Sequence, residues 1–290
     1  MTAVATAERR FGGLGAATVG RRRVNGLAIY AISYLAFIYV PVLFLPLFSF
    51  NDSIYIAFPL KGFTFEWYHE MVNSKGLVAA LENSLKVAAT VSVLSTILGT
   101  LAAKAVTRYR MPGKGPAVGF ILIPLVIPGI ILGIALLVIA NEAGIPLSLF
   151  TIGAGHMLEC TAFSMVVMIS RLEGFDKNLE EASLDLGENA WSTFRRVTFP
   201  LAVPGLVASL LLTFTISFDE FILAFFLAGN EATLPVYIWG QLRFPRKLPS
   251  VLALGACIVI ASFIIVTFAE WVRRRGVKGI QVKAVSEVAR

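Results

Sequence analysis

Charged residues are scarce in this chain of 290 residues. Asp, Glu, Lys and Arg together make up only 15% of the sequence, 57% is hydrophobic, and the mean hydropathy is +0.79. Soluble domains carry about 25% charged residues, so this chain has too few of them to cover a surface that faces water. The composition therefore excludes an ordinary soluble domain and predicts an all-α polytopic membrane protein.

Cysteine and histidine are rare as well, and neither occurs in a pattern typical of a catalytic or metal site. Cys160 and Cys257 fall in apolar runs, and His69 and His156 are the only histidines. The spacings of a zinc site or a disulfide framework are missing. So is the G-x-x-x-x-G-K-[ST] loop that binds the phosphates of ATP. We predict that the chain is not an enzyme and binds no metal or cofactor itself.

Six apolar runs are long enough to cross about 30 Å of hydrocarbon. We place these spans near residues 27–50, 83–106, 116–140, 148–170, 202–228 and 251–272. The first run, at about 24 residues, is too long for a signal-peptide core of about 7–15 residues, and no A-x-A-like site follows it. The spans define a transmembrane domain over residues 27–275, with a mobile tail over 1–26 and a second tail over 276–290.

The distribution of Lys and Arg sets the orientation. The net charge is +7, but the basic residues lie beside apolar runs and form no face interleaved with aromatics, which argues against nucleic-acid binding. With both termini inside, the outer segments hold only Lys61, Lys75, Lys86, Arg243, Arg246 and Lys247. The positive-inside rule therefore predicts an N-in/C-in topology with cytoplasmic tails.

Two outer segments are longer than simple connections. Residues 51–82 contain Trp67, Tyr68 and His69, and residues 229–250 contain TLPVYIWGQLRF. Aromatic residues at this depth are typical of the headgroup belt of a membrane. Contact with an external protein partner is an equally open interpretation.

The third span contains both prolines and closely spaced glycines. Pro124 and Pro128 interrupt its helix, which favours either a kinked helix lining a pathway or ordinary packing. Gly129 and Gly133 have the small-xxx-small spacing that lets two helices approach closely.

A segment rich in charge lies between the fourth and fifth spans and reads FDKNLEEASLDLGENAWSTFRRVTFPLAVP over residues 175–204. Asn178 and Glu181 have the spacing of a capping box, so a helix is predicted to start there. Gly187 suits the left-handed residue that follows a helix. Asn189 is predicted to cap a second short helix.

The second helix of this segment carries one apolar stripe. Trp191, Phe194 and Val197 recur at i, i+3 and i+6, and Pro200 is predicted to end the helix. Such a stripe fits a groove on another protein. It also fits an interfacial helix that lies on the lipid surface, and the residues by themselves leave both interpretations open.

The same segment resembles the EAA loop of ABC importer permeases, whose pattern is E-A-A-x3-G-x9-I-x-L-P. The matching positions are Glu181, Ala182, Ser183, Gly187, Val197, Phe199 and Pro200. The resemblance implies the six-span type I importer permease fold. It also implies that residues 175–200 form a cytoplasmic coupling loop, in which Trp191 and Phe194 belong to the helix that enters a cleft on a separate ATPase.

The resemblance extends to SFNDS, PLVIPGIILGIALL and SFDEFILAFFLAG, which are similar to permease subunits of spermidine/putrescine importers. It implies a bacterial inner-membrane location and four kinds of association. These are membrane lipid, a second, PotB-like permease, two PotA-like ATPase subunits that use ATP and Mg, and a periplasmic, PotD-like binding protein.

Acidic residues inside the apolar runs point to the substrate. A carboxylate at mid-bilayer costs about 2.5–3.5 kcal/mol on insertion scales, so Asp219, Glu220 and Glu159 are expected to face a cavity or a partner. Since the span interiors hold almost no Lys or Arg, the pathway suits a cation such as putrescine or spermidine. His156 lies three residues from Glu159 and is expected to pair with it. An ion-gradient transporter that uses Glu159 or Asp219 is the alternative.

Overall fold

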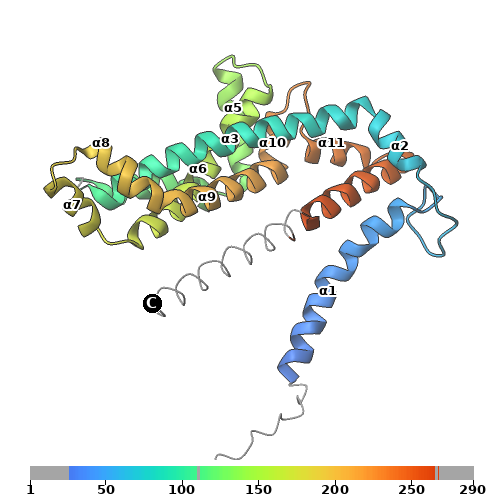
Figure 1. Ribbon diagram of the computed structural model, residues 1–290. Coiled ribbons are helices and arrows are strands. Elements are labelled where there is room, and N and C mark those ends of the chain that lie inside the picture. The colour runs from blue at the N-terminus through green and yellow to red at the C-terminus, as the bar shows by residue number, and fades with distance from the viewer. Residues whose placement is uncertain (1–25, 110–111, 265–266, 268–290) are drawn as a thin grey trace, which may run out of the picture. The chain divides into compact units, whose positions relative to one another are not determined.

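The computed structural model describes residues 26–109, 112–264 and 267, which are helical over most of their length (Figure 1). The elements are α1 (Gly26–Ser49), α2 (Glu66–Asn73), α3 (Lys75–Arg108), α4 (Lys114–Val126), α5 (Gly129–Glu142), α6 (Leu149–Glu173), α7 (Asn178–Asp185), α8 (Ala190–Thr193), the π-helix η1 (Phe194–Thr198), α9 (Phe199–Asp219), α10 (Ile222–Leu227), α11 (Leu234–Gln241) and the 3₁₀ turn η2 (Pro245–Lys247). The predicted tails over 1–26 and 276–290 lie outside the described residues, except for Gly26, where α1 begins.

The chain divides into two compact units, residues 1–49 with 255–290 and residues 50–254. In the first, α1 is an apolar helix that accommodates Pro41 and Pro46. In the second, α3, α6 and α9 run side by side as a bundle (Figure 1). Helices α7 and α8 lie at one end of this bundle, and α2 and α11 lie at the other.

Five helices in the described part of the chain are long and apolar enough to cross a membrane, and the number rises to six if α4 and α5 form one bent span. The axes of α4 and α5 differ by 103°, so the third predicted span has a sharp bend. Pro128 explains where the bend falls. The residue before a proline is driven out of the helical region, and Ile127 is extended with φ −73° and ψ 130°.

The predicted continuous span over residues 202–228 is wrong in the structure. Helix α9 ends at Asp219, and Glu220 is extended with ψ 113° before α10 starts at Ile222. At the other end the same helical stretch begins earlier than predicted, at Ala190. The helix therefore joins the charged segment directly to the bundle and is interrupted next to the two adjacent acids.

The buried core of the bundle has two apolar clusters. One joins α3, α6 and α10 through Val87, Val91, Ile152, Cys160, Ala224 and Leu227. The other joins α3, α6 and α9 through Ala103, Val106, Met165, Met168, Leu172 and Ala202.

Between these clusters, three buried hydroxyls from three helices meet. Ser209 donates to Ser164 at 2.8 Å and lies 3.4 Å from Thr96. Helices α3 and α6 come very close at this level, since a Cβ added to Gly99 would lie 2.7 Å from the backbone nitrogen of Met165. A polar layer thus crosses the apolar interior.

Helix α10 packs on α5 through the glycines that the sequence analysis singled out. A Cβ on Gly133 would lie 2.6 Å from the ring of Phe226, and one on Gly129 would lie 3.6 Å from Ile222. The small-xxx-small spacing therefore does bring two helices together, and α5 supports the short helix that follows the acids.

Candidate functional site: the charged insert and the intramembrane acids

The first helix of the charged insert ends as the sequence predicts. Gly187 has φ +89°, the left-handed region that favours glycine. The Gly187 N–H donates to Leu184 O at 2.9 Å, and the Glu188 N–H donates to Ser183 O at 3.2 Å. This pair of bonds is the Schellman motif, so α7 has a fixed end point and the chain reverses sharply after it.

The predicted capping box at the start of α7 is wrong. Helix α7 does begin at Asn178, but no side-chain bond from its N-cap residue, Lys177, is formed. Asp176 accepts from both the backbone and the side-chain nitrogen of Asn178, at 3.0 and 3.1 Å. Asp176 holds the start because an acidic side chain placed before a helix can reach its free N–H groups.

The second helix of the insert begins at its predicted cap, where Asn189 Oδ1 accepts from the Ser192 N–H at 2.9 Å. Pro200 does not end this helix, which corrects the sequence analysis. Helix α8 passes into the π-helix η1 and then into α9, and Pro200 occupies the first turn of α9, where proline is tolerated. Short π segments are frequent at functional sites.

The predicted apolar stripe is divided between two environments. Trp191 stacks on Phe194 with ring centroids 5.7 Å apart, yet Trp191 is 70% exposed. Phe194 is half-buried beneath the Lys104 ammonium, which lies 4.4 Å from its ring centroid, and Val197 is also half-buried. Phe194 thus contacts α3 through Lys104, and Trp191, at the outer end of the stripe, is left open.

Other apolar side chains of the insert are exposed in the same way. Leu186, beside the Gly187 turn, is 86% exposed, and Leu179 and Leu184 are about half exposed. Glu181 and Ala182 are exposed on α7 as well. These residues form a small apolar and acidic surface at the end of the bundle, where the backbone is held by defined caps.

An ion pair that the sequence analysis did not identify attaches the insert to the bundle. Arg108 Nε lies 2.9 Å from Glu180 Oε2, and both side chains are largely buried. Thr198 Oγ1 donates to the other oxygen of Glu180 at 2.6 Å. Arg108 Nη2 donates to Leu172 O at 2.9 Å, and its guanidinium lies 4.6 Å from the ring of Phe175. The sequence offered only two weak signals for this pair. Glu180 is an acid next to the EAA-like Glu181, and Arg108 is a basic residue near the end of the second predicted span.

The insert is braced internally as well. Ser183 Oγ lies 3.0 Å from Thr193 Oγ1, which connects α7 to α8. Glu188 forms an ion pair with Arg196 of η1. Ser183 stands where the EAA pattern has alanine, so this chain gains a hydrogen bond at that position.

The acids of the fifth span lie at the break between α9 and α10. Asp219 is the last residue of α9 and is exposed. Glu220 is half-buried, and its Oε1 accepts from the Leu223 N–H at 3.0 Å. Glu220 therefore bonds the start of α10.

Helix α6 contributes the third acid and the histidine, but these two do not pair. His156 is 1% exposed, and its Nδ1 lies 2.9 Å from Ser217 Oγ of α9. Within the described residues, Glu159 makes no ion pair with His156. Glu159 is half-buried and close enough to Glu220 for the two carboxylates to interact electrostatically. The fold thus brings two acids together, while His156 belongs to the contact between α6 and α9.

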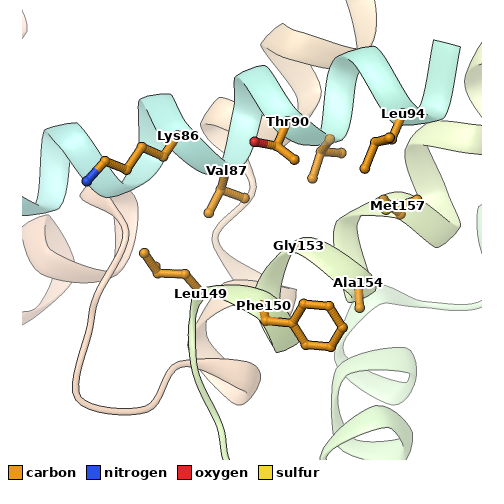
Figure 2. A pocket seen from close by; sticks show the side chains of 10 residues that line it. Lys86, Val87, Thr90, Leu94, Leu149, Phe150, Gly153, Ala154 and Met157 are labelled. Atoms are coloured by element: carbon orange, nitrogen blue, oxygen red, sulfur yellow. The ribbon is translucent and has the colours of Figure 1, made fainter. Parts of the chain in front are cut away.

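A separate apolar pocket of about 400 Å³ opens between α3 and α6. Figure 2 shows Val87, Thr90 and Leu94 of α3 facing Leu149 and Met157 of α6. Lys86 is the one charged residue of its lining, and it forms an ion pair with Glu82 at 2.8 Å. A pocket with this lining does not suit a cation, so the acids at the helix break remain the better candidates for the pathway.

Comparison with known proteins identifies the family. Residues 95–277 match the model of the family described as "Binding-protein-dependent transport system inner membrane component". The chain is 32% identical over 264 residues to the spermidine/putrescine transport system permease protein PotC of Escherichia coli strain K12, covering 90% of this chain and 97% of PotC. It is 34% identical over 243 residues to the putrescine transport system permease protein PotI of the same strain, covering 81% and 85%.

Two more distant similarities agree with this result. A probable molybdenum ABC transporter permease protein of Haloferax volcanii is 34% identical over 206 residues, covering 65% of this chain and 76% of that protein. A chain in the crystal structure of a bacterial ABC transporter involved in the import of the acidic polysaccharide alginate superposes with a TM-score of 0.58. That match covers 86% of this chain and 94% of the other at 17% identity, which establishes the shared fold alone.

Membership of this family excludes the ion-gradient transporter considered as an alternative. Importers of this kind combine inner-membrane permease subunits with ATPase subunits and a binding protein, and the ATPase subunits use the ATP. The chain therefore belongs to the family of binding-protein-dependent transport system inner membrane components, as a multi-pass permease subunit that binds no cofactor and is not itself an enzyme.

Proposed function

We propose that the charged insert, residues 175–200, is the EAA coupling loop that docks a separate ATPase on the cytoplasmic side. The observation that supports this is the exposed surface of Leu184, Leu186 and Trp191 on two short helices with fixed caps. Exposed apolar residues on a rigid backbone are the usual core of a protein interface, because little conformational entropy is lost on binding. A free interfacial helix would not need such caps and ion pairs.

Co-purification of the ATPase tests the docking role. The permease would be expressed with its partner subunits, taken from the genes beside its own, and isolated in mild detergent. Leu186→Ser is expected to weaken retention of the ATPase, because an interface centre loses about 2 kcal/mol or more, which is roughly 30-fold in affinity. Ile145→Ser is the control, since Ile145 is 42% exposed but lies in the connection between α5 and α6. Undiminished retention with Leu186→Ser would contradict the proposal.

We further propose that the chain forms half of the translocation pathway for a polyamine, putrescine or spermidine, or for a related cationic amino compound. The observation that supports the substrate class is that α6 and the end of α9 carry three acids, Glu159, Asp219 and Glu220, none of which forms an ion pair within the described residues. Intramembrane acids are costly and mark ion or substrate pathways. The similarity to PotC and PotI supports the same substrate class.

Uptake by a reconstituted transporter tests the substrate. Proteoliposomes would contain this permease with the proposed PotB-like permease, PotA-like ATPase and PotD-like binding protein from the same organism. We expect ATP-dependent accumulation of labelled putrescine or spermidine, and none of molybdate. Equal putrescine uptake by liposomes with and without this chain would refute the polyamine assignment, and molybdate uptake would replace it with the substrate class of the Haloferax relative.

A further inference from the structure

We propose that Arg108 and Glu180 are positioning residues that transmit movement of the docked insert to α3, α6 and the base of α9. The inference rests on the proposed docking of the ATPase at α7 and α8. Glu180 neighbours the EAA-like residues Glu181 and Ala182, but it is turned away from the exposed surface and into the bundle.

The ion pair is the meeting point of four elements. Arg108, the last residue of α3, is 7% exposed and lies 2.9 Å from Glu180 of α7, which is 17% exposed. The same guanidinium donates to Leu172 O near the end of α6 and lies against Phe175. The hydrogen bond to Leu172 O and the charge attraction to Glu180 together hold α3, α6 and α7 in one arrangement.

Glu180 extends the connection to the fifth span. Its second oxygen accepts from Thr198, which is the last residue of η1 and is buried. Helix α9 follows without a break. A carboxylate shared between Arg108 and Thr198 thus links the docking helix to two membrane helices at once.

The remaining side-chain hydrogen bonds and ion pairs of the insert lack this property, and Phe194 contacts α3 alone, through the Lys104 ammonium. Ser183 bonds Thr193, and Glu188 pairs with Arg196, so both contacts stay within the insert and η1. Of the ion pairs in the described residues, the one between Arg108 and Glu180 alone joins the insert to α3. Interactions that connect two sites through a contiguous set of bonds are the physical basis of coupling between them.

The test separates transmission from docking. Glu180→Gln would be introduced into the complete transporter in proteoliposomes, and three quantities measured: ATPase retained, ATP hydrolysed and labelled putrescine taken up. Coupling between sites typically changes an equilibrium by about 5- to 150-fold. We expect the ratio of putrescine to ATP to fall at least about fivefold, while the amount of bound ATPase stays at the unmodified level.

Two variants keep the proposal falsifiable if Glu180→Gln fails to assemble, since an arginine left unpaired in a buried site is strongly destabilising. Thr198→Val retains the ion pair and removes only the link to η1, so it is expected to lower the same ratio. Glu142→Gln is the matched control, because Glu142 is an exposed acid at the end of α5 and lies outside the insert, and it is expected to leave the ratio unchanged.

Each remaining outcome overturns the inference. If uptake and ATP hydrolysis fall together in Glu180→Gln and Thr198→Val, with a constant ratio, the pair is merely structural. If Glu180→Gln reaches the membrane in the normal amount but prevents retention of the ATPase, Glu180 belongs to the docking surface. Failure of the unmodified chain to retain an ATPase would instead refute the proposed function.

Discussion

The insert and the helix break at Asp219 use acidic residues in opposite ways. In the insert, Glu180 and Glu188 each have a basic partner. At the break, Glu220 accepts a hydrogen bond from the Leu223 N–H, has no ion-pair partner among the described residues, and lies near a second acid, Glu159. Paired acids fix the position of one element against another, whereas acids near one another without basic partners favour a cation from outside. The ion pairs hold the first region in shape, and we propose that the second region binds a cation.

The largest effect is expected where the shape of the insert depends on one backbone conformation. Gly187→Val forces a β-branched residue into the left-handed region, at a cost of about 1–2 kcal/mol or more. We expect putrescine uptake to fall to background while the protein still reaches the membrane, as measured by uptake and by membrane fractionation.

Gly144→Val is the control for this substitution. Gly144 also has a positive φ, of 65°, and has open space around it, but it lies in the connection between α5 and α6. The two variants impose similar backbone strain at two places. Equal loss of uptake in both would show that strain alone is responsible and that the insert has no special role.

A smaller effect is expected at the acids of the break. Asp219→Asn removes an exposed charge, and interactions with a charged group contribute about 1.5–3 kcal/mol, or roughly 10- to 150-fold in the KM for a cation. Glu220→Gln removes charge but keeps an oxygen for the Leu223 N–H, so α10 should remain capped and uptake should fall in the same way. Both would be measured as uptake against putrescine concentration.

For the acids, Glu142→Gln serves as the reference, because Glu142 is an exposed acid at the end of α5. ATPase retention should be unchanged in all three variants. An unchanged KM in Asp219→Asn and Glu220→Gln would show that these two residues do not contact the substrate. The acids at the break would then have no role in transport that distinguishes them from those of the insert.

The smallest effect is expected at Ser183. Ser183→Ala removes the hydrogen bond to Thr193 and restores the residue of the EAA pattern, so the insert should lose about 1 kcal/mol of local stability. Limited proteolysis of the insert should become modestly faster, with uptake close to that of the unmodified chain. A loss of uptake as complete as that of Gly187→Val would show that the Ser183 bond is essential to coupling.

Local patterns in the sequence predicted the local features of the molecule well. Apolar run length predicted a multi-span helical protein, and the identities of Gly187 and Asn189 predicted a turn and a cap that the structure confirms. Each of these depends on a few neighbouring residues, whose backbone preferences are strong. The spacing of Gly129 and Gly133 likewise predicted a close helix contact.

Features that depend on competing or distant partners were not predictable. Asp176, two residues earlier in the chain, accepts from the Asn178 N–H and from the Asn178 side-chain amide, so the Asn178 side chain serves as a donor and not as the predicted cap. The break after Asp219 lies within an apolar run, where hydropathy shows no boundary. Glu180 and Arg108 lie far apart in the sequence, so their ion pair depends on the packing of α7 against α3. The sequence analysis identified Asp219 and Glu220 as acids of the fifth span. It did not predict that helix α9 ends between them.

The close approach of α3 and α6 at the polar layer of Thr96, Ser164 and Ser209 limits which residues the bundle can accept there. Because a Cβ on Gly99 would meet the main chain of α6, and a main chain cannot rotate away as a side chain does, the spacing of α3 and α6 is fixed at that level. Positions such as Val93 and Leu101 can exchange one apolar residue for another, since about half of each side chain or more is exposed. Position 99 therefore requires glycine, because any side chain there would push α3 away from α6.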